Sequence, residues 1–258
     1  LQPADSTQLG HGADASGWGG IPASKRKITL RRAWRVQNEG LWRTYAGEQQ
    51  HVATQMKQVP SKFHKPIAFR PAFKSATDKL PGQLRTDINE QYLLSGVPAA
   101  VIANVMTSGM NERYSGANAG SMFGEGVSAT FSLLCRDKTL DCVTGCCLRQ
   151  TYFAEDGAKI DQYTGSPDTS NGGKIRGELY PRGGGRGPSQ GVHYVFLCRV
   201  ILGCTVRTQR GATNAVPMDG AQVTESGGLW ATNLRRDLAE VKGATTPTNY
   251  HSLLAELG

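Results

Sequence analysis

The alternation of apolar and polar positions near the start of the chain predicts a strand followed by a helix. In KITLRRAWRVQN, residues 27–38, apolar side chains are interspersed with arginine, a pattern that suits an exposed strand. Asn38 then provides a side-chain oxygen that can cap a helix. The apolar face of that helix is expected to consist of five residues: Leu41, Trp42, Tyr45, Val52 and Met56.

A second strand and helix are predicted further along, after a connector over residues 58–90 that holds several Pro and Lys residues and some helix. Tyr92, Leu93 and Leu94 have the composition of a short buried strand. Pro98 suits the first turn of a helix, and Gly109 suits its C-terminal stop. We therefore expect a strand, a tight turn and a helix that ends at a glycine.

The most apolar run is HYVFLCRVILGCTVRT, residues 193–208, which is rich in Val, Ile, Tyr and Phe and predicts a central strand. Polar loops flank it at 165–191 and 209–249, with some helix near LWATNLRRDLAEV, residues 229–241. The ending NYHSLLAELG begins a further element. No internal repeat of solenoid length is visible.

The composition favours one domain and a mobile arm. The chain has 258 residues, of which 38% are hydrophobic and 32 are Gly, so we expect a loop-rich fold with residues 1–24 as a disordered N-terminal linker. No apolar run approaches the roughly 20 residues of a membrane span, which predicts a soluble protein without a membrane partner. Four of the six Cys crowd into one segment, unlike a disulfide framework, and indicate an intracellular, cytoplasmic or nuclear, location.

The formal net charge of +8 is concentrated in SKRKITLRRAWR and in the Arg and Lys residues between 54 and 86. Such a surface attracts phosphates, although basic residues often serve solubility alone. The stretch YPRGGGRGPSQG, residues 180–191, has the Arg-Gly spacing of segments that contact RNA. Nucleic acid is therefore one possible partner.

The clustered cysteines do not predict a metal site. Cys135, Cys142, Cys146 and Cys147 lack C-x-x-C spacing and have no His among them, so an incidental Cys-rich segment is the better interpretation. Cys198 and Cys204 are expected to be small buried apolar residues. The sequence assigns ordinary surface or core positions to four histidines: His51, His64, His193 and His251.

Several motifs in order resemble the catalytic domain of the poly(ADP-ribose) polymerase family, the diphtheria-toxin-like ADP-ribosyltransferases. WRVQNEGLWRTYAGEQ is similar to the family's opening strand and helix, and YLLSGVPAAVIANVMTSGMNERYSG to its L-F-H-G-T strand, following helix and G-x-x-x-R turn. FGEG followed by TYFAEDGAKIDQY resembles the F-G-x-G-x-Y-F-A segment that ends in a second Tyr eleven residues on. VFLCRVILG matches a later core strand, and NYHSLLAELG resembles the approach to the last strands.

The resemblance implies an α+β fold in which two packed mixed or antiparallel β-sheets surround an NAD cleft, with peripheral helices. It covers residues 25–258 and implies NAD as the donor substrate. Tyr152, taken as the catalytic-site residue present in the chain, and Tyr163 would hold the nicotinamide ring between them. Gly96 would offer its backbone N–H and C=O to the carboxamide.

The remaining expected site residues follow from the same motifs. Phe153 and Ala154 adjoin the first tyrosine and are assigned to the cofactor site with it. Arg113 would approach the pyrophosphate. Lys159 lies in the acidic turn between the two tyrosines and could instead pair with a neighbouring carboxylate: Glu155, Asp156 or Asp161.

Three departures from the family pattern bear on activity. The family's ribose-binding histidine is Ser95 here, and the serine of the carboxamide clamp is Ile160. The family's catalytic glutamate, which stabilises positive charge as the glycosidic bond breaks, would lie beyond Gly258, so we expect the domain to be truncated at its C-terminus. An insert of 24 residues, 127–150, separates Gly126 from Thr151.

The insert suggests a retained intron as one hypothesis. It begins with Val, whose codons start with GT, ends with Gln, one codon of which is CAG, and preserves the reading frame. Joining Gly126 to Thr151 restores GEGTYFAE, a closer match to the family motif. The alternative is a genuine loop at the rim of the site.

Two functions follow for the domain. The first is NAD-dependent transfer of a single ADP-ribose to a protein acceptor that the sequence does not identify, since the family's chain elongators keep both His and Glu. The second is a catalytically inactive module of the same fold that binds NAD, ADP-ribose or another protein, which Ser95 and Ile160 favour.

Overall fold

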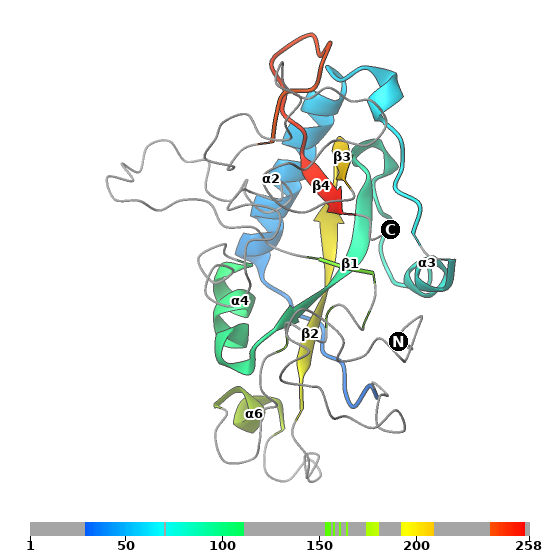
Figure 1. Ribbon diagram of the computed structural model, residues 1–258. Coiled ribbons are helices and arrows are strands. Elements are labelled where there is room, and N and C mark those ends of the chain that lie inside the picture. The colour runs from blue at the N-terminus through cyan, green and yellow to red at the C-terminus, as the bar shows by residue number, and fades with distance from the viewer. Residues whose placement is uncertain are drawn as a thin grey trace.

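The computed structural model describes residues 29–69, 71–110, 153–155, 157, 160, 164, 174–180, 192–208 and 238–255. These residues combine helices and strands, so the fold class is α+β (Figure 1). The α-helices are α2 (Glu39–Met56), α3 (Pro71–Thr77), α4 (Ile102–Ser108) and α6 (Lys174–Leu179). Short 3₁₀ helices are formed by Ser61–Phe63, Thr86–Ile88 and Ala99–Val101. The strands are β1 (Glu90–Val97), β2 (Tyr194–Ile201), β3 (Thr205–Thr208) and β4 (Ser252–Ala255).

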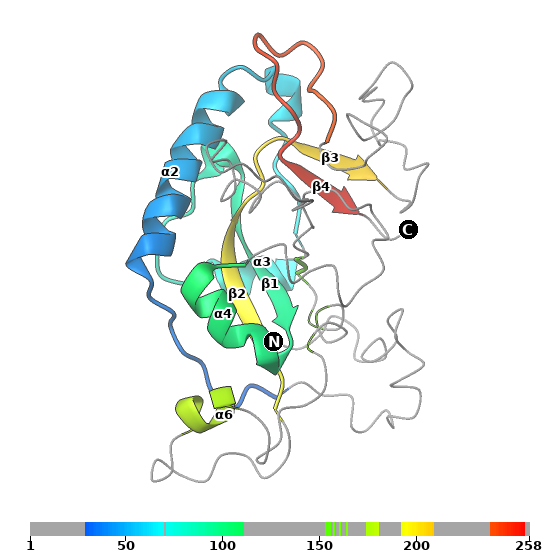
Figure 2. The same cartoon turned by 90° about the vertical axis from the view of Figure 1, so that its left-hand side faces the viewer.

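Two small sheets organise these elements. Strands β1 and β2 pair antiparallel along their whole lengths, from Glu90 opposite Ile201 to Val97 opposite Tyr194. Strands β3 and β4 pair parallel, with Thr205 opposite Ser252. Figure 2 shows α2 and α4 on one side of β1 and β2, while β3 and β4 continue from the end of β2. These sheets and the helices beside them confirm the α+β part of the predicted fold.

Helix α2 forms where its sequence predicts, but Trp42, which was expected on the apolar face, is 50% exposed. The Asn38 side chain accepts a hydrogen bond from the Leu41 N–H at 3.1 Å, which satisfies one of the free donors in the first turn. Val52 and Met56 are buried in the largest core cluster, with Ile88, Ile201 and Leu238 among their partners. Burial of this face accounts for most of the stability of an amphipathic helix.

The second predicted pair of elements is also present. The strand around Leu93 is β1, which is longer than expected at eight residues. Pro98 is extended and precedes the 3₁₀ turn that leads into α4. Gly109 ends α4 with a φ of 82°, a backbone conformation that side chains other than glycine rarely adopt, and its N–H bonds to the Val105 carbonyl at 3.0 Å.

The strand predicted at residues 27–38 is wrong over its described part. Residues 29–38 form no strand or helix, and nearly all of them are exposed. An extended segment becomes a strand only when another strand satisfies its backbone donors and acceptors. This segment is held instead by side-chain contacts of Arg32 and Asn38.

The apolar run at 193–208 forms two strands rather than one. Gly203, with a φ of 55°, breaks the run between β2 and β3, and its N–H bonds to the Ile88 carbonyl at 2.8 Å. The Asn89 side chain donates to the Gly203 carbonyl at 2.7 Å. Within the described residues β2 has a strand partner only in β1, and Val195 and Leu197 are almost half exposed. The prediction of one central strand is therefore wrong for the described residues.

Two further predictions concern the C-terminal part and the membrane. The helix expected near 229–241 does not include residues 238–241, because Glu240 forms an antiparallel bridge with Asn249 there. The ending predicted to begin a new element contains β4. Across the described residues, none of the helices has the length and apolar character required to cross a bilayer.

Candidate functional site

Two of the predicted site residues lie on β1. Ser95 pairs with Phe196 and Gly96 with Val195 in the antiparallel register. Successive residues of a strand point to opposite faces, so their side-chain positions belong to different faces of the sheet. The Ser95 side chain is buried, whereas Gly96 is partly exposed.

The structure brings two further predicted residues to the same strand. Leu94 and Ala154 exchange both backbone hydrogen bonds, each at 2.9 Å, across 60 positions of the chain. Since the backbone groups of Leu94 face Ala154, those of Gly96, two residues along, point to that same edge of β1 and away from β2. Phe153 precedes Ala154 and packs against the neighbouring core. Gly96 and Ala154 therefore belong to one edge of the sheet.

Ile160 has the location of a core residue. It is 3% exposed and packs in a cluster with Phe73, Leu93, Leu94, Val200 and Leu202. By the family resemblance, Ile160 takes the position of a serine that is expected to bind the carboxamide of NAD. Its side chain provides only apolar contacts there.

The other predicted site residues lie outside the described residues: Arg113, Tyr152, Lys159 and Tyr163. The same applies to the linker 1–24, to the glycine-rich motif around 120–126, to the insert 127–150 with its four cysteines, and to most of the loop 180–191. Of the predicted residues, the structure brings together Ser95, Gly96, Phe153 and Ala154.

A buried charged cluster at the beginning of β1 was missed by the sequence analysis. The fully buried Glu90 carboxylate accepts hydrogen bonds from Tyr45 at 2.6 Å, from Gln49 at 2.8 Å and from Arg199 at 2.7 and 2.9 Å. The Arg85 backbone N–H adds another at 2.8 Å. The available signal was a lone Glu at the start of a buried strand, which does not by itself identify its partners.

The hydrogen bonds decide the protonation state of this cluster. Burial disfavours the charged form of Glu90, but the bonds from Arg199 and Tyr45 outweigh it, so the pKa of Glu90 is lowered from its usual value. Burial and the bond to Glu90 raise the pKa of Tyr45. Arg199 also lies over the Trp42 ring, 5.4 Å from its centroid. The two carboxylate oxygens of Glu90 accept all of these hydrogen bonds from within the fold. Glu90 is therefore a structural rather than a catalytic carboxylate.

His251 is a second buried titratable group. Its Nδ1 accepts the Cys204 N–H at 2.9 Å, which leaves the proton on Nε2, 3.0 Å from the Gln55 side-chain oxygen. Burial, with a smaller effect from His51, lowers the pKa of His251 to about 4. A Cβ on Gly203 would lie 2.6 Å from the His251 ring, so the close approach requires glycine there. His251 thus joins α2, the β2–β3 turn and β4, as a core histidine.

The cysteines and the carboxylates do not build a metal centre in the described part of the chain. No three His, Cys, Asp or Glu side chains gather there as ligands would. Cys204 is buried and Cys198 partly so, and burial raises the pKa of each thiol to about 12. Both cysteines are therefore unreactive thiols at neutral pH.

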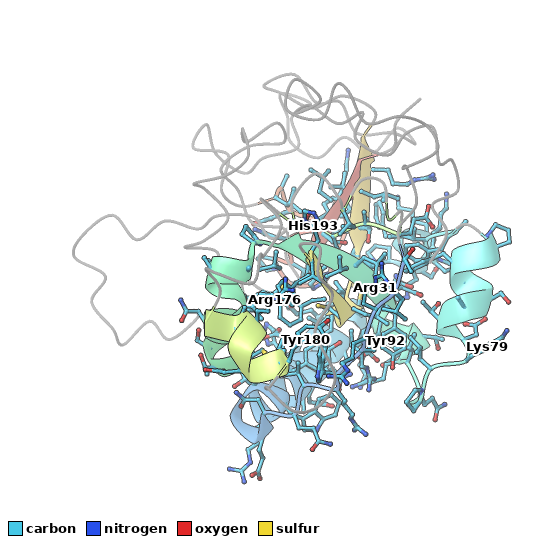
Figure 3. The ribbon with its side chains drawn as sticks, turned by 90° about the horizontal axis from the view of Figure 1, so that it is seen from below. Arg31, Lys79, Tyr92, Arg176, Tyr180 and His193 are labelled. Atoms are coloured by element: carbon cyan, nitrogen blue, oxygen red, sulfur yellow. The ribbon has the colours of Figure 1, made fainter. Side chains whose placement is uncertain are left out.

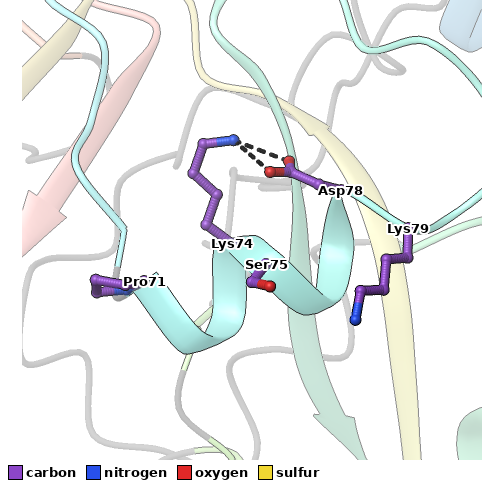
Figure 4. A pocket seen from close by; sticks show the side chains of 5 residues that line it. All are labelled: Pro71, Lys74, Ser75, Asp78 and Lys79. Carbon is purple, nitrogen blue, oxygen red and sulfur yellow. Dashed lines mark hydrogen bonds and ion pairs between the residues drawn. The ribbon is translucent and has the colours of Figure 1, made fainter.

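A hollow of about 440 Å³ lies on α3, and its lining includes none of the predicted site residues (Figure 4). It is lined by Pro71, Lys74, Ser75, Asp78 and Lys79. The Lys74 ammonium donates to both carboxylate oxygens of Asp78, at 2.8 and 2.9 Å, so the charge of this lysine is offset. With one further lysine and no aromatic face, this hollow has no feature that would hold a nicotinamide ring.

Comparison of the chain with models of protein families and with curated proteins found no match.

Proposed function

We propose that the chain is an NAD-dependent ADP-ribosyltransferase domain that transfers a single ADP-ribose to a protein side chain. The fold proposed with it has two packed sheets around an NAD cleft. The observation that carries the proposal is the bridge between Leu94 and Ala154. It joins two motifs that the sequence analysis assigned to one nicotinamide site, although 60 positions separate them.

The direction of the Gly96 backbone supports its role. Its N–H and C=O point to the edge of β1 at which Ala154 lies, and they can pair with the C=O and N–H₂ of a carboxamide. Continuation of this antiparallel pairing to position 152 would use the same Gly96 groups, so on this proposal the pairing ends at Ala154 and the carboxamide takes the place of the next pair. On this proposal the Tyr152 ring covers one face of the nicotinamide and Tyr163 the other.

The proposed reaction breaks one bond and forms one. The bond between C1′ of the ribose and the nicotinamide nitrogen breaks, and nicotinamide leaves with the bonding electron pair. The acceptor side chain then bonds to C1′, and its proton passes to solvent. Aromatic faces and the Gly96 backbone hold the pyridinium in place, while stabilisation of the developing positive charge is assigned to the glutamate that the resemblance implies.

A second candidate is a binding module of the same fold that retains a dinucleotide pocket without turnover. The burial of Ile160 favours it, because no hydroxyl is available there for the carboxamide. The Ser95 hydroxyl is buried as well and reaches less far than an imidazole would. Both changes predict weaker NAD binding than a complete site would give.

The test is incubation of the full-length protein with NAD labelled in its adenylate half, measuring protein-bound label and released nicotinamide. Gly96→Val adds a side chain where the carboxamide would approach, and we expect at least a tenfold loss of transfer, which is about 1.4 kcal/mol. Gln91→Val, on the same strand, is the matched control and should retain activity. Transfer that survives Gly96→Val unchanged would contradict the assigned role of Gly96.

Calorimetry with a non-hydrolysable NAD analogue separates the two candidates. Binding together with transfer supports the enzyme, and binding without transfer or nicotinamide release supports the module. A protein that neither binds the analogue nor releases nicotinamide refutes both.

A further inference from the structure

An arginine-rich segment, residues 29–37, is exposed and yet held by side-chain contacts in its middle and directly after its end. In its middle, Arg32 Nη1 donates to the Leu179 carbonyl at the end of α6, 3.5 Å away. Directly after it, the Asn38 side-chain amide donates to the Met106 and Thr107 carbonyls of α4, each at 3.1 Å. Because these contacts order the segment in advance, a ligand would bind it with a small loss of conformational entropy.

Aromatic side chains meet over the same segment. Trp34 packs edge-on against Tyr180, with ring centroids 5.4 Å apart. The Arg32 guanidinium lies 5.9 Å from the Trp34 ring and 5.5 Å from the Tyr180 ring. Trp34 nevertheless remains 43% exposed. Tyr180, which follows α6 (Figure 3), is the first residue of YPRGGGRGPSQG.

These contacts join two stretches that are 147 positions apart in the sequence. The basic segment and the beginning of the Arg-Gly stretch were each singled out by sequence as possible RNA contacts, and the pair Trp34 and Tyr180 brings them together. Among the described residues, the ion pairs do not neutralise Arg31 or Arg35 of this segment, and Glu39 is paired with Arg43 at 2.6 Å.

We propose that Arg31, Trp34 and Arg35 form a binding surface for single-stranded RNA. The two exposed guanidinium groups contact phosphates, and the half-exposed indole stacks on a base. Single strands fit better than duplexes, because only unpaired bases present a face to an indole. An acidic peptide would use the arginines but would gain little from Trp34. The inference goes beyond the proposed function and does not depend on NAD.

Fluorescence anisotropy with a labelled single-stranded RNA of about 16 nucleotides tests the proposal. We expect binding that weakens steeply between about 50 and 200 mM salt. The double variant R31Q/R35Q removes two phosphate contacts, so the slope of log affinity against log salt should become shallower by about 1.4. Trp34→Ala should weaken binding by roughly 5- to 100-fold without changing that slope.

The control variant K65Q/K79Q removes the same amount of charge from exposed positions elsewhere. Figure 3 shows Lys79 on the far side of the view from α6. Because these lysines lie outside the proposed surface, this variant should leave the slope of log affinity against log salt close to that of the wild type. Circular dichroism of R31Q/R35Q checks that the fold is intact. We expect it to be, because both residues are exposed and neither side chain forms an ion pair with a described residue.

Three results would overturn the proposal. One is the absence of salt-dependent RNA binding by the full chain. Another is an equal loss of affinity in R31Q/R35Q and K65Q/K79Q, which would indicate net charge alone. The third is competition by polyglutamate as effective as that by unlabelled RNA, which would identify an acidic peptide as the partner.

Discussion

At the scale of single residues, Arg199 and Glu90 form an ion pair whose carboxylate is buried. The Glu90 side chain is fully buried and Arg199 is 22% exposed. Arg199→Met removes two of the bonds to the carboxylate and leaves a buried charge, so we expect a loss of about 3 kcal/mol in the free energy of unfolding. Urea unfolding monitored by circular dichroism measures this loss.

The acid dependence of that loss has a definite sign. Because the folded-state pKa of Glu90 is lowered, the carboxylate stabilises the fold at neutral pH, and this stabilisation is lost as the pH falls through the lowered pKa. The difference in the free energy of unfolding between Arg199→Met and wild type should therefore become smaller below about pH 4. Arg43→Met is the control, because its pair with Glu39 is exposed and should cost less than about 0.5 kcal/mol. Equal losses in the two variants would be inconsistent with a buried pair.

At the scale of elements, Asn38 connects two helices. It caps α2 through its side-chain oxygen and binds the end of α4 through its side-chain amide. Asn38→Ala removes both functions and should cost about 2 kcal/mol, whereas Asn38→Ser keeps a capping oxygen and should cost about half as much. Thermal or urea unfolding of both variants makes the comparison. If the two substitutions destabilise the protein equally, the bonds to α4 rather than the cap account for the effect.

Elements determined by short-range patterns could be predicted from sequence. The Asn38 cap, the burial of Val52 and Met56 and the Gly109 stop each depend on a few neighbouring residues, and the structure confirms all three. Trp42, expected on the same face, is instead half exposed. The strand expected at 27–38 depended on a partner that no local pattern identifies. The single strand expected at 193–208 was wrong because the contacts of Gly203 with Ile88 and His251 are long-range.

At the scale of the whole molecule, the candidate site depends on pairings between distant segments. The bridge from Leu94 to Ala154 could not be derived from periodicity. The pattern of apolar and polar residues around each position predicts local structure but does not identify a pairing partner 60 positions away. Only the order of motifs in the resemblance implied that they belong together. The charged cluster around Glu90 had no such motif, and its partners Tyr45 and Arg199 come from 45 positions before it and 109 after it.

His251 connects parts of the fold that are far apart in the chain, so its titration should affect global stability. Its folded pKa of about 4 lies below the ordinary value of 6.5, so between these values the unfolded chain binds the proton more readily. Stability should therefore fall by about 3 kcal/mol as the pH drops from 6.5 to 4. Urea unfolding at several pH values across this range measures the dependence.

His251→Asn isolates this contribution. The asparagine oxygen can accept the Cys204 N–H in place of Nδ1, but the side chain does not titrate and loses the contact with Gln55. We expect the variant to be less stable at pH 7. Its free energy of unfolding should also change less between pH 6.5 and 4, because the histidine no longer takes up a proton on unfolding. A dependence as steep as that of the wild type would assign the acid sensitivity to other groups, and the connection of α2, the β2–β3 turn and β4 through a neutral imidazole would then be incorrect.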